Sequence, residues 1–488
     1  MRWFLVISMA LFAVTVGVAA ALFGGLLVSL LVVPLLVLIF VLSDYRVGVV
    51  TLAFLLPWTA SPLLPQAQGL NIINYLVAVS VLSFGIRAVF SRRPVVHVPR
   101  AMIWFYLVPL TIGVVLSVSH LSEAARNYAG TEEALAFGMS EFLKSRYLKP
   151  LGLVIFAFLL ANAVKDSKRP ERFVVPFVLA GALPSLVVFA LIAVYKVSLS
   201  DLQAQRSFMG PIGLHANEMA IMLAFVVGPM LFLLPSWRSV VTRFFAGLAL
   251  AAMVLALLLT FSRGGFLALT VIVIMFMVQQ RRVLVLLAGT AVLAIAVLVA
   301  PSAIKERLFT GVEQGAIAYS VGNLNDPLTA GRIAVWEKLA PEVMRSPLWG
   351  RGLSSTAWSD LVRSGRYRAT HPHNLYLAIL MDLGVLGLAA MLYWYWVILR
   401  AQNFLRKQPE VDPLLRQFFA GSMASFAGVL VMSVTNGNYY PKPEYTFFWF
   451  SLGILFAYWP GEPSSRHRRS YARAKMSQPD NPMVRGSV

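Results

Sequence analysis

Cysteine is absent from the 488 residues, and charged residues are scarce, at 13%. The first absence excludes disulfide bonds, thiol catalysis and cysteine-ligated metal sites. The second excludes a soluble protein, because soluble domains contain about 25% charged residues and cannot bury so much apolar surface in one core. A bilayer accepts apolar segments of about 20 residues each. With 59% hydrophobic residues, the chain is predicted to be a membrane protein.

Apolar segments of helix length cover most of the chain. A helix-length window finds about fourteen, with twelve as the alternative count. They lie near 3–22, 24–43, 47–63, 71–90, 101–119, 148–164, 173–195, 216–235, 241–261, 264–279, 283–301, 374–399, 417–434 and 444–459. The first two show no signal-peptide cleavage site, so we expect both to be retained. The sequence predicts an all-α polytopic membrane protein with about 12–14 transmembrane helices.

The segments divide the chain into five regions. We expect N-terminal transmembrane helices over 1–200, further ones with an arginine turn over 201–301, one large loop over 302–373, C-terminal transmembrane helices over 374–460, and a disordered basic tail over 461–488. Two shorter loops are expected near 120–147 and 435–443, on the same side as the large loop. Within the large loop, helical periodicity over 332–343 predicts a short amphipathic helix.

The net charge of +20 is explained by topology. Basic residues in the short loops fall on one side when the spans alternate, and this side is predicted to be the cytoplasm, with both termini inside. Nucleic acid is therefore not an expected partner. The large loop also contains many basic residues, but long loops cross membranes regardless of charge. The basic residues of the large loop are therefore predicted to contact an anionic ligand or lipid headgroups.

The strongest local pattern is His-Pro-His-Asn over 371–374, where the large loop re-enters the membrane. At a helix start on the aqueous face, the imidazole of His373 is suited to accept a proton from a hydroxyl near neutral pH. Asn374 is expected either to cap the helix or to bind a ligand. Asp382 lies nine residues on, on the opposite helix face, so it cannot orient His373 directly. Gly384 and Gly387 are expected to allow close helix packing.

Arginines on the outer side form a second group of candidates. Arg263 lies in a tight turn between two spans, where it either reaches lipid headgroups or donates to a phosphate. Arg332 begins the amphipathic segment that contains Trp336, and Arg351 lies in a glycine-rich turn. Arg146 belongs to a charged helix edge before a span, and an interface anchor is its alternative role.

The segment before the span at 216–235 contains a further candidate. Asn217 is expected to be the N-cap of that helix, with Glu218 in its first turn. No acidic cluster is evident on the outer side, so a bound divalent cation is not expected. If a diphosphate is bound there, arginines must neutralise its charge.

Four motifs, taken in order, resemble the O-antigen ligase and O-antigen polymerase family of bacterial inner-membrane glycosyltransferases. The resemblance covers roughly residues 206–399. The motifs are Gly213 to Ala220, Phe261-Ser262-Arg263-Gly264-Gly265, Arg332 with Trp336 and Pro347 through Gly352, and His373-Asn374 with Gly384 and Gly387.

The resemblance implies a GT-C-like fold and transfer of a glycan from undecaprenyl diphosphate to a hydroxyl, without cofactor or metal. It places the activating base at His373 and the arginines that stabilise the leaving diphosphate at Arg263 and Arg332. Arg146, Asn217, Asn374 and Arg351 are the expected substrate-binding residues. Direct attack by the hydroxyl implies an inverting reaction.

The leading hypothesis is a ligase that transfers the glycan to lipid A-core on the periplasmic side of the bacterial inner membrane. The expected partners are the undecaprenyl-linked glycan, a lipid A-core or other glycan acceptor, and membrane lipids. A polymerase of repeat units and a protein O-oligosaccharyltransferase are alternatives within the family. A polysaccharide exporter and a structural partner of an assembly complex are alternatives from other classes.

Overall fold

The computed structural model describes residues 38–59, 72–91, 95–131, 133–197, 213–280 and 332–460, together with Leu35, Ser61 and Met209. The regular elements in this part of the chain are all helical, which confirms the predicted all-α class. The predicted spans at 3–22 and 283–301, most of that at 24–43, and the tail at 461–488 lie outside the described residues.

Eight stretches of helix among the described residues are long and apolar enough to cross a membrane. They are Ile72–Phe90 (in α4, Ile72–Ser91), Arg100–Asn127 (containing α6, Val108–Ser117), Met139–Lys165 (containing α10, Lys149–Lys165), Pro170–Tyr195 (containing α11, Val174–Tyr195), Ala216–Ser236 (containing α13, Ala216–Leu233), Val240–Leu259 (α14), Leu375–Leu405 (α21) and Pro413–Met432 (α22). Each coincides with a predicted segment. The predicted spans at 47–63 and 264–279 form shorter apolar helices, Tyr45–Trp58 and α15 (Arg263–Gln279).

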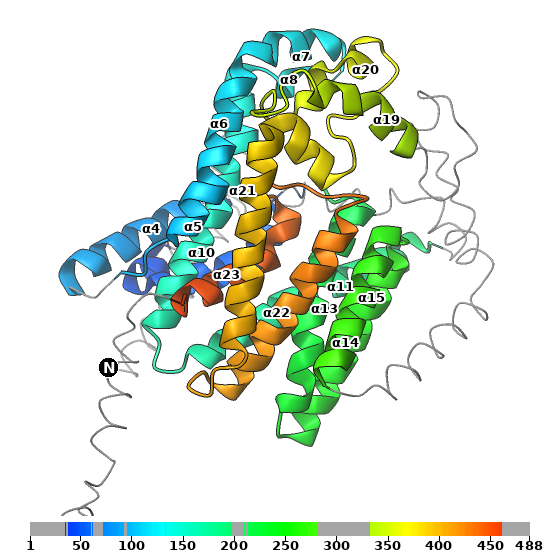
Figure 1. Ribbon diagram of the computed structural model, residues 1–488. Coiled ribbons are helices and arrows are strands. Elements are labelled where there is room, and N and C mark those ends of the chain that lie inside the picture. The colour runs from blue at the N-terminus through cyan, green and yellow to red at the C-terminus, as the bar shows by residue number, and fades with distance from the viewer. Residues whose placement is uncertain are drawn as a thin grey trace, which may run out of the picture.

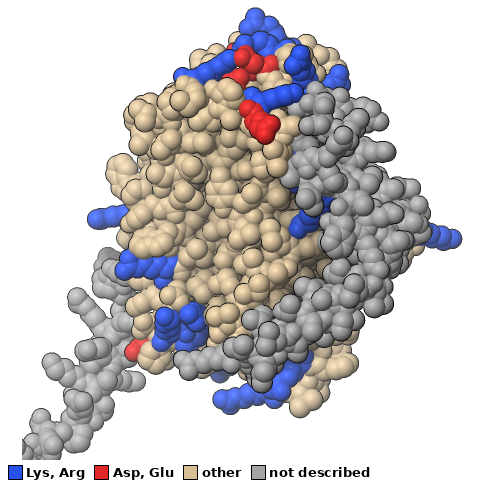
Figure 2. Space-filling view, turned by 45° about the vertical axis from the view of Figure 1, so that its right-hand side comes forward, with Lys and Arg blue, Asp and Glu red and all other residues tan. Residues whose placement is uncertain are grey.

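The long helices lie side by side, and the surface agrees with this arrangement (Figure 1). In the view of Figure 2, charged side chains gather toward the top and the bottom, and a broad uncharged face lies between them. Large apolar side chains such as Val89, Phe90 and Val240 are exposed on the helices. A multi-pass membrane protein has this distribution, because its helices present apolar side chains to lipid.

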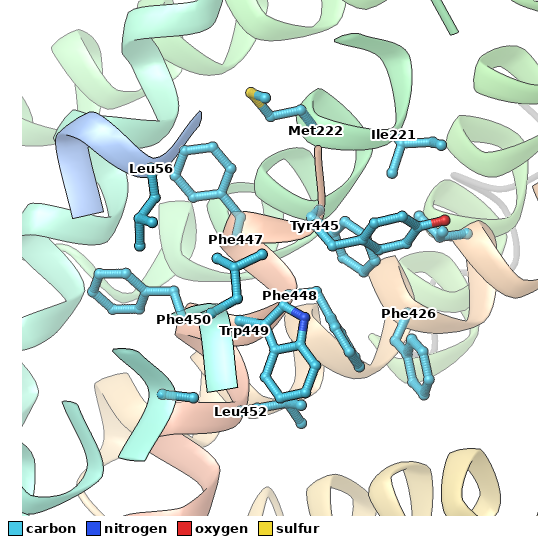
Figure 3. Close-up of a cluster of buried hydrophobic side chains, with 14 of the residues drawn as sticks. Leu56, Ile221, Met222, Phe426, Tyr445, Phe447, Phe448, Trp449, Phe450 and Leu452 are labelled. Atoms are coloured by element: carbon cyan, nitrogen blue, oxygen red, sulfur yellow. The ribbon is translucent and has the colours of Figure 1, made fainter. Parts of the chain in front are cut away.

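The last predicted span, at 444–459, forms α23 (Thr446–Ala457) in the centre of the bundle. Every residue from Thr446 to Phe456 is buried. Figure 3 shows Phe447, Phe448 and Trp449 of this helix among side chains from other segments. A helix that is apolar on all sides is stable in lipid or in a protein core, and the burial of this whole stretch decides for the core. We therefore place α23 in the protein core rather than at the lipid boundary.

Glycines allow the closest helix contacts. A Cβ at Gly421 of α22 would lie 2.5 Å from the Cα of Pro229 in α13, and one at Gly228 would lie 2.6 Å from the carbonyl oxygen of Gly421. Ser425 of α22 donates a hydrogen bond of 2.7 Å to the carbonyl of Ala224. Small residues and a serine at the contact are the usual means by which membrane helices bring their backbones together.

Short helices form a cap over one end of the bundle, here named the loop end (Figure 1). They are α7 (Leu121–Asn127), α8 (Glu133–Ala136), α19 (Arg332–Val343) and α20 (Asp360–Arg363). The amphipathic helix predicted over 332–343 is confirmed as α19. The loop expected at 120–147 is instead largely helical. Its polar residues gain partners in the cap: the Asn127 side chain donates to the carbonyl of Ala357, at 3.0 Å.

The helix α21 is broken at Gly384, which has φ 68° and ψ −171°. No pattern in the sequence predicted this break. The backbone freed by the break pairs with the glycine-rich turn of the large loop. Val385 donates to Pro347 O at 2.8 Å, and Gly352 donates to Asp382 O at 2.9 Å. A Cβ at Gly384 would lie 2.2 Å from Leu348 O, so only glycine fits this crossing.

A buried carboxylate beside the break joins the large loop to the segment after α22. Asp382, 4% exposed, accepts hydrogen bonds from the backbone amides of Ser354 and Ser355, at 3.0 and 2.8 Å. It also accepts from the hydroxyls of Ser355 and Tyr439, the latter at 2.7 Å. The two amides and the two hydroxyls all donate to Asp382. An ionised carboxylate can accept four hydrogen bonds, whereas a neutral amide would place its own donor group against some of these donors.

We expect Gly421→Ala to lower stability by about 1–3 kcal/mol, because the added methyl group overlaps backbone atoms of α13 that cannot move independently. The matched control is Gly85→Ala in α4, where no atom lies within 4 Å of the added Cβ. The measurement is thermal unfolding of the purified protein in detergent. Equal melting temperatures for the two variants would contradict the close contact of α13 with α22.

We expect Asp382→Asn to loosen the cap, because the amide nitrogen would face donors and leave buried groups unsatisfied at a cost of about 1–3 kcal/mol. Hydrogen exchange of residues 347–355 should become faster. The control is Asp360→Asn, which changes an exposed acid of the same cap. Unchanged exchange in Asp382→Asn would show that its carboxylate does not hold the loop.

Candidate functional site

The predicted base lies in a turn at the loop end that is fixed from several sides. Asn374 caps α21 by accepting from the amides of Tyr376 and Leu377, both at 3.0 Å, which confirms its predicted capping role. His373 has φ 54°, a left-handed conformation that costs a non-glycine residue about 1–3 kcal/mol. Such strain persists where the surroundings enforce it, and it is often found at active sites.

The enforcing contacts come from the cap and from α22. The indole nitrogen of Trp336 donates to Pro372 O at 2.9 Å, and the Tyr367 hydroxyl donates to His371 O at 2.8 Å. The amide of Leu375 donates to Ser433 O, at 2.9 Å, just beyond the end of α22. The turn over 371–374 is here named the histidine turn. These hydrogen bonds attach it to the cap, through α19 and Tyr367, and to the bundle, through Ser433.

Arg332 is brought to the same region by α19. It begins that helix, and Trp336 lies four residues later on the same face. The charge of Arg332 acts on the Tyr367 hydroxyl, which itself holds the histidine turn. Burial nevertheless raises the pKa of Tyr367, so its hydroxyl stays protonated and remains a donor.

Arg263 begins α15 directly after the cap residue Ser262. Phe261 before it has φ 50°, which turns the chain sharply from α14 into α15. A Cβ at Gly264 would lie 2.9 Å from Met432 Cγ and 3.1 Å from the Thr435 hydroxyl. Arg263 therefore starts its helix beside the end of α22. The histidine turn is bonded to the same end, so the two predicted motifs are neighbours of one segment.

The start of α13 differs from the prediction. His215 is its N-cap, and its Nδ1 accepts from the amide of Asn217 at 3.3 Å. The Glu218 carboxylate in turn accepts from the His215 amide at 2.9 Å. Asn217 is therefore not the N-cap. Since His215 and Glu218 form a reciprocal capping box, the backbone donors are satisfied without the Asn217 side chain.

Arg146 reaches this region from the π-helical turn Lys144–Leu148 before α10. Its Nη1 donates to the hydroxyl of Tyr440, and its guanidinium carbon lies 5.5 Å from the centre of that ring. The ammonium of Lys442 also lies 5.5 Å from the same centre. No sequence pattern indicated Tyr440 and Lys442 as site residues. The only signal was their place in an outer loop.

His371 lies within reach of these charges. Its ring centre is 4.2 Å from that of His373. Burial lowers the pKa of His371 well below its ordinary value, and the neighbouring His373, Lys442, Arg146 and His215 lower it further. His371 is therefore neutral near pH 7 and can accept a hydrogen bond or a proton.

Arg351, predicted to bind substrate, lies in the glycine-rich turn with a buried acid as its partner. Its guanidinium pairs with Glu342 of α19, which is 4% exposed. The second Glu342 oxygen accepts from the amide of Asp360, at 2.8 Å. These contacts join α19, α20 and the glycine-rich turn, so the structure gives Arg351 a positioning role in the cap.

A narrow cavity lies behind Tyr440, lined also by Ser433, Asn438, Tyr439 and other mostly aromatic residues. Its volume of about 30 Å³ accommodates roughly one water molecule. Among the described residues, no group of three potential metal ligands occurs.

The fold and these contacts define a multi-pass α-helical membrane protein with a histidine and several cations gathered at one end of the bundle. Residues 248–392 match the family model described as O-antigen ligase. The predicted resemblance is thus confirmed over these residues. Arg263, Arg332 and His373 fall inside the match, whereas Arg146 and Lys442 lie outside it. No match was found among curated proteins.

The lowered pKa of His371 predicts a pH dependence of stability. Below about pH 6.5 the unfolded chain binds a proton at this residue that the folded protein does not bind, so stability falls as pH falls. We expect a loss of up to about 1.4 kcal/mol per pH unit below that point from His371. The measurement is chemical unfolding in detergent between pH 7.5 and 5.

The same titration of His371→Asn should show a shallower loss, because the group that gains the proton on unfolding is gone. His97→Asn, which changes an exposed histidine before Arg100, serves as the control and should keep the wild-type slope. Identical slopes for all three proteins would contradict a neutral, half-buried His371.

Proposed function

We propose that this protein is a glycosyltransferase that moves a glycan from undecaprenyl diphosphate to an acceptor hydroxyl at the periplasmic face of the bacterial inner membrane. The acceptor in the leading form of the proposal is lipid A-core. The observation that carries it is the histidine turn, held in a strained conformation by Trp336 and Tyr367 within the residues that match the O-antigen ligase family.

The reaction needs one base and several cations. His373 takes the proton of the acceptor hydroxyl, whose oxygen attacks the anomeric carbon of the first sugar. A new glycosidic bond forms as the bond from that carbon to the phosphate oxygen breaks. The electron pair leaves with undecaprenyl diphosphate. Because the attack is direct, the configuration at the anomeric carbon is inverted.

The leaving diphosphate gains negative charge in the transition state. Arg263 and Arg332, which begin α15 and α19, supply positive charge for it. Arginine suits this task because its planar fork of donors binds two phosphate oxygens at once. Arg146, Asn217, Asn374 and Arg351 remain the proposed substrate-binding residues. For Asn374 and Arg351, this role would be added to the contacts they already make in the protein.

Polymerisation of repeat units uses the same donor and the same chemistry, with a lipid-linked glycan as acceptor. It is the alternative within the family matched by residues 248–392. The two functions differ in what accumulates when the enzyme is lost. A missing ligase leaves long lipid-linked chains, whereas a missing polymerase leaves single repeat units on the core.

We expect His373→Ala to abolish polysaccharide display in a strain that lacks the wild-type gene, because the acceptor hydroxyl loses its base. Loss of general base catalysis alone reduces rates by about 10²–10⁴-fold. Undecaprenyl-linked glycan should accumulate, and its length identifies a ligase or a polymerase. The measurement is gel analysis of surface and lipid-linked glycan at matched protein level.

The control is His97→Ala, which should display polysaccharide normally. Normal display by His373→Ala would refute the catalytic role and favour an exporter or a structural partner. Purified wild-type protein supplied with donor and acceptor gives the second criterion, since an exporter forms no glycosidic bond.

A further inference from the structure

Two cations are held against a single aromatic ring at the loop end. Arg146 approaches Tyr440 from the turn before α10, and Lys442 approaches it from the segment after α22. Each lies 5.5 Å from the ring centre, within the range of a cation–π contact. The two positive charges also repel one another. The ring partly offsets this repulsion through its negative face.

Neither cation has an acid as a direct partner among the described residues. Within the described part of the chain, no carboxylate oxygen lies within 4.0 Å of either Arg146 or Lys442. The nearby acids that act on Lys442 are Glu444 and Glu218. Glu218 is engaged by the amide of His215, and Glu444 is 1% exposed. Burial raises the pKa of Glu444, which weakens its negative charge near neutral pH.

The segment that contains Lys442 is fixed before any ligand binds. The Tyr439 hydroxyl donates to Asp382 at 2.7 Å, and the Tyr106 hydroxyl donates to Tyr439 O at 2.8 Å. The amide of Asn438 donates to the Tyr445 hydroxyl at 3.0 Å. A cation held on such a segment loses little conformational entropy on binding an anion, so less of the electrostatic attraction is offset by the cost of ordering the segment.

We propose that Lys442 and Arg146, held together by Tyr440, form a phosphate-binding pair that takes the diphosphate of the lipid-linked donor beside the histidine turn. This inference rests on the proposed function and adds Lys442 as a substrate-binding residue. Both cations act on His371, so the bound anion lies near the histidines. Lys442 contributes a compact point charge, and Arg146 contributes a planar fork of donors.

The test measures binding of geranyl diphosphate to the purified full-length protein in detergent by titration calorimetry. We expect Lys442→Met to weaken binding about tenfold or more, because a charge-assisted hydrogen bond to a phosphate is lost. Lys442→Arg should restore most of the affinity. The matched control is Lys407→Met, just beyond the opposite end of α21 from the histidine turn, which should bind as wild type. Melting temperatures confirm that each variant is folded.

Unchanged affinity in folded Lys442→Met would overturn the proposal. Phosphatidylglycerol added to the micelles distinguishes the sources of phosphate: if it displaces geranyl diphosphate at comparable concentration, the pair is a lipid-headgroup site and the donor assignment is wrong. Lys442-dependent binding without any glycan transfer by wild type would refute the proposed function alone, whereas normal transfer with Lys442-independent binding would refute this inference alone.

Discussion

The carboxylate of Asp382 is the contact on which the loop end depends. The break of α21 at Gly384 exposes backbone groups inside an apolar bundle, where unsatisfied polar groups cost several kcal/mol each. The glycine-rich turn satisfies these groups only if it stays in place, and Asp382 holds its continuation through Ser354 and Ser355. The same carboxylate binds Tyr439 and so positions the segment that contains Tyr440 and Lys442.

Much of the bundle could be predicted from the sequence. A membrane helix satisfies its backbone hydrogen bonds within its own segment and presents apolar side chains to lipid, so it is recognisable as a long apolar run. In the described part of the chain, eight such runs form helices long enough to cross a membrane, and the periodicity over 332–343 correctly predicted α19. The cap at Asn374 was also predictable, since asparagine before an apolar helix accepts from the first free amides. These features are local, so the sequence of a single segment is sufficient to predict each of them.

The features that define the candidate site are not local. Tyr440 lies 294 residues from Arg146 along the chain, and Tyr439 lies 57 residues from Asp382. No pattern within one segment indicates such a pair. The break in α21 was missed for a related reason: Gly384 lies in an apolar run that hydropathy describes well, and the turn that pairs with it comes from another segment. The sequence predicted Asn217 as the N-cap of α13, because asparagine is a preferred N-cap residue and histidine is not. The structure has His215 in that position.

The cations and the histidines impose opposite demands on the site. Positive charge near an imidazole lowers its pKa, which keeps the ring neutral but also makes it a weaker base. The effect is evident at His371, whose pKa Arg146 and Lys442 both lower. A diphosphate bound by these cations adds negative charge and offsets their effect, so the pKa of a nearby imidazole rises. In the proposed reaction the bound donor therefore offsets the two cations that act on His371, whose ring centre lies 4.2 Å from that of the proposed base, His373.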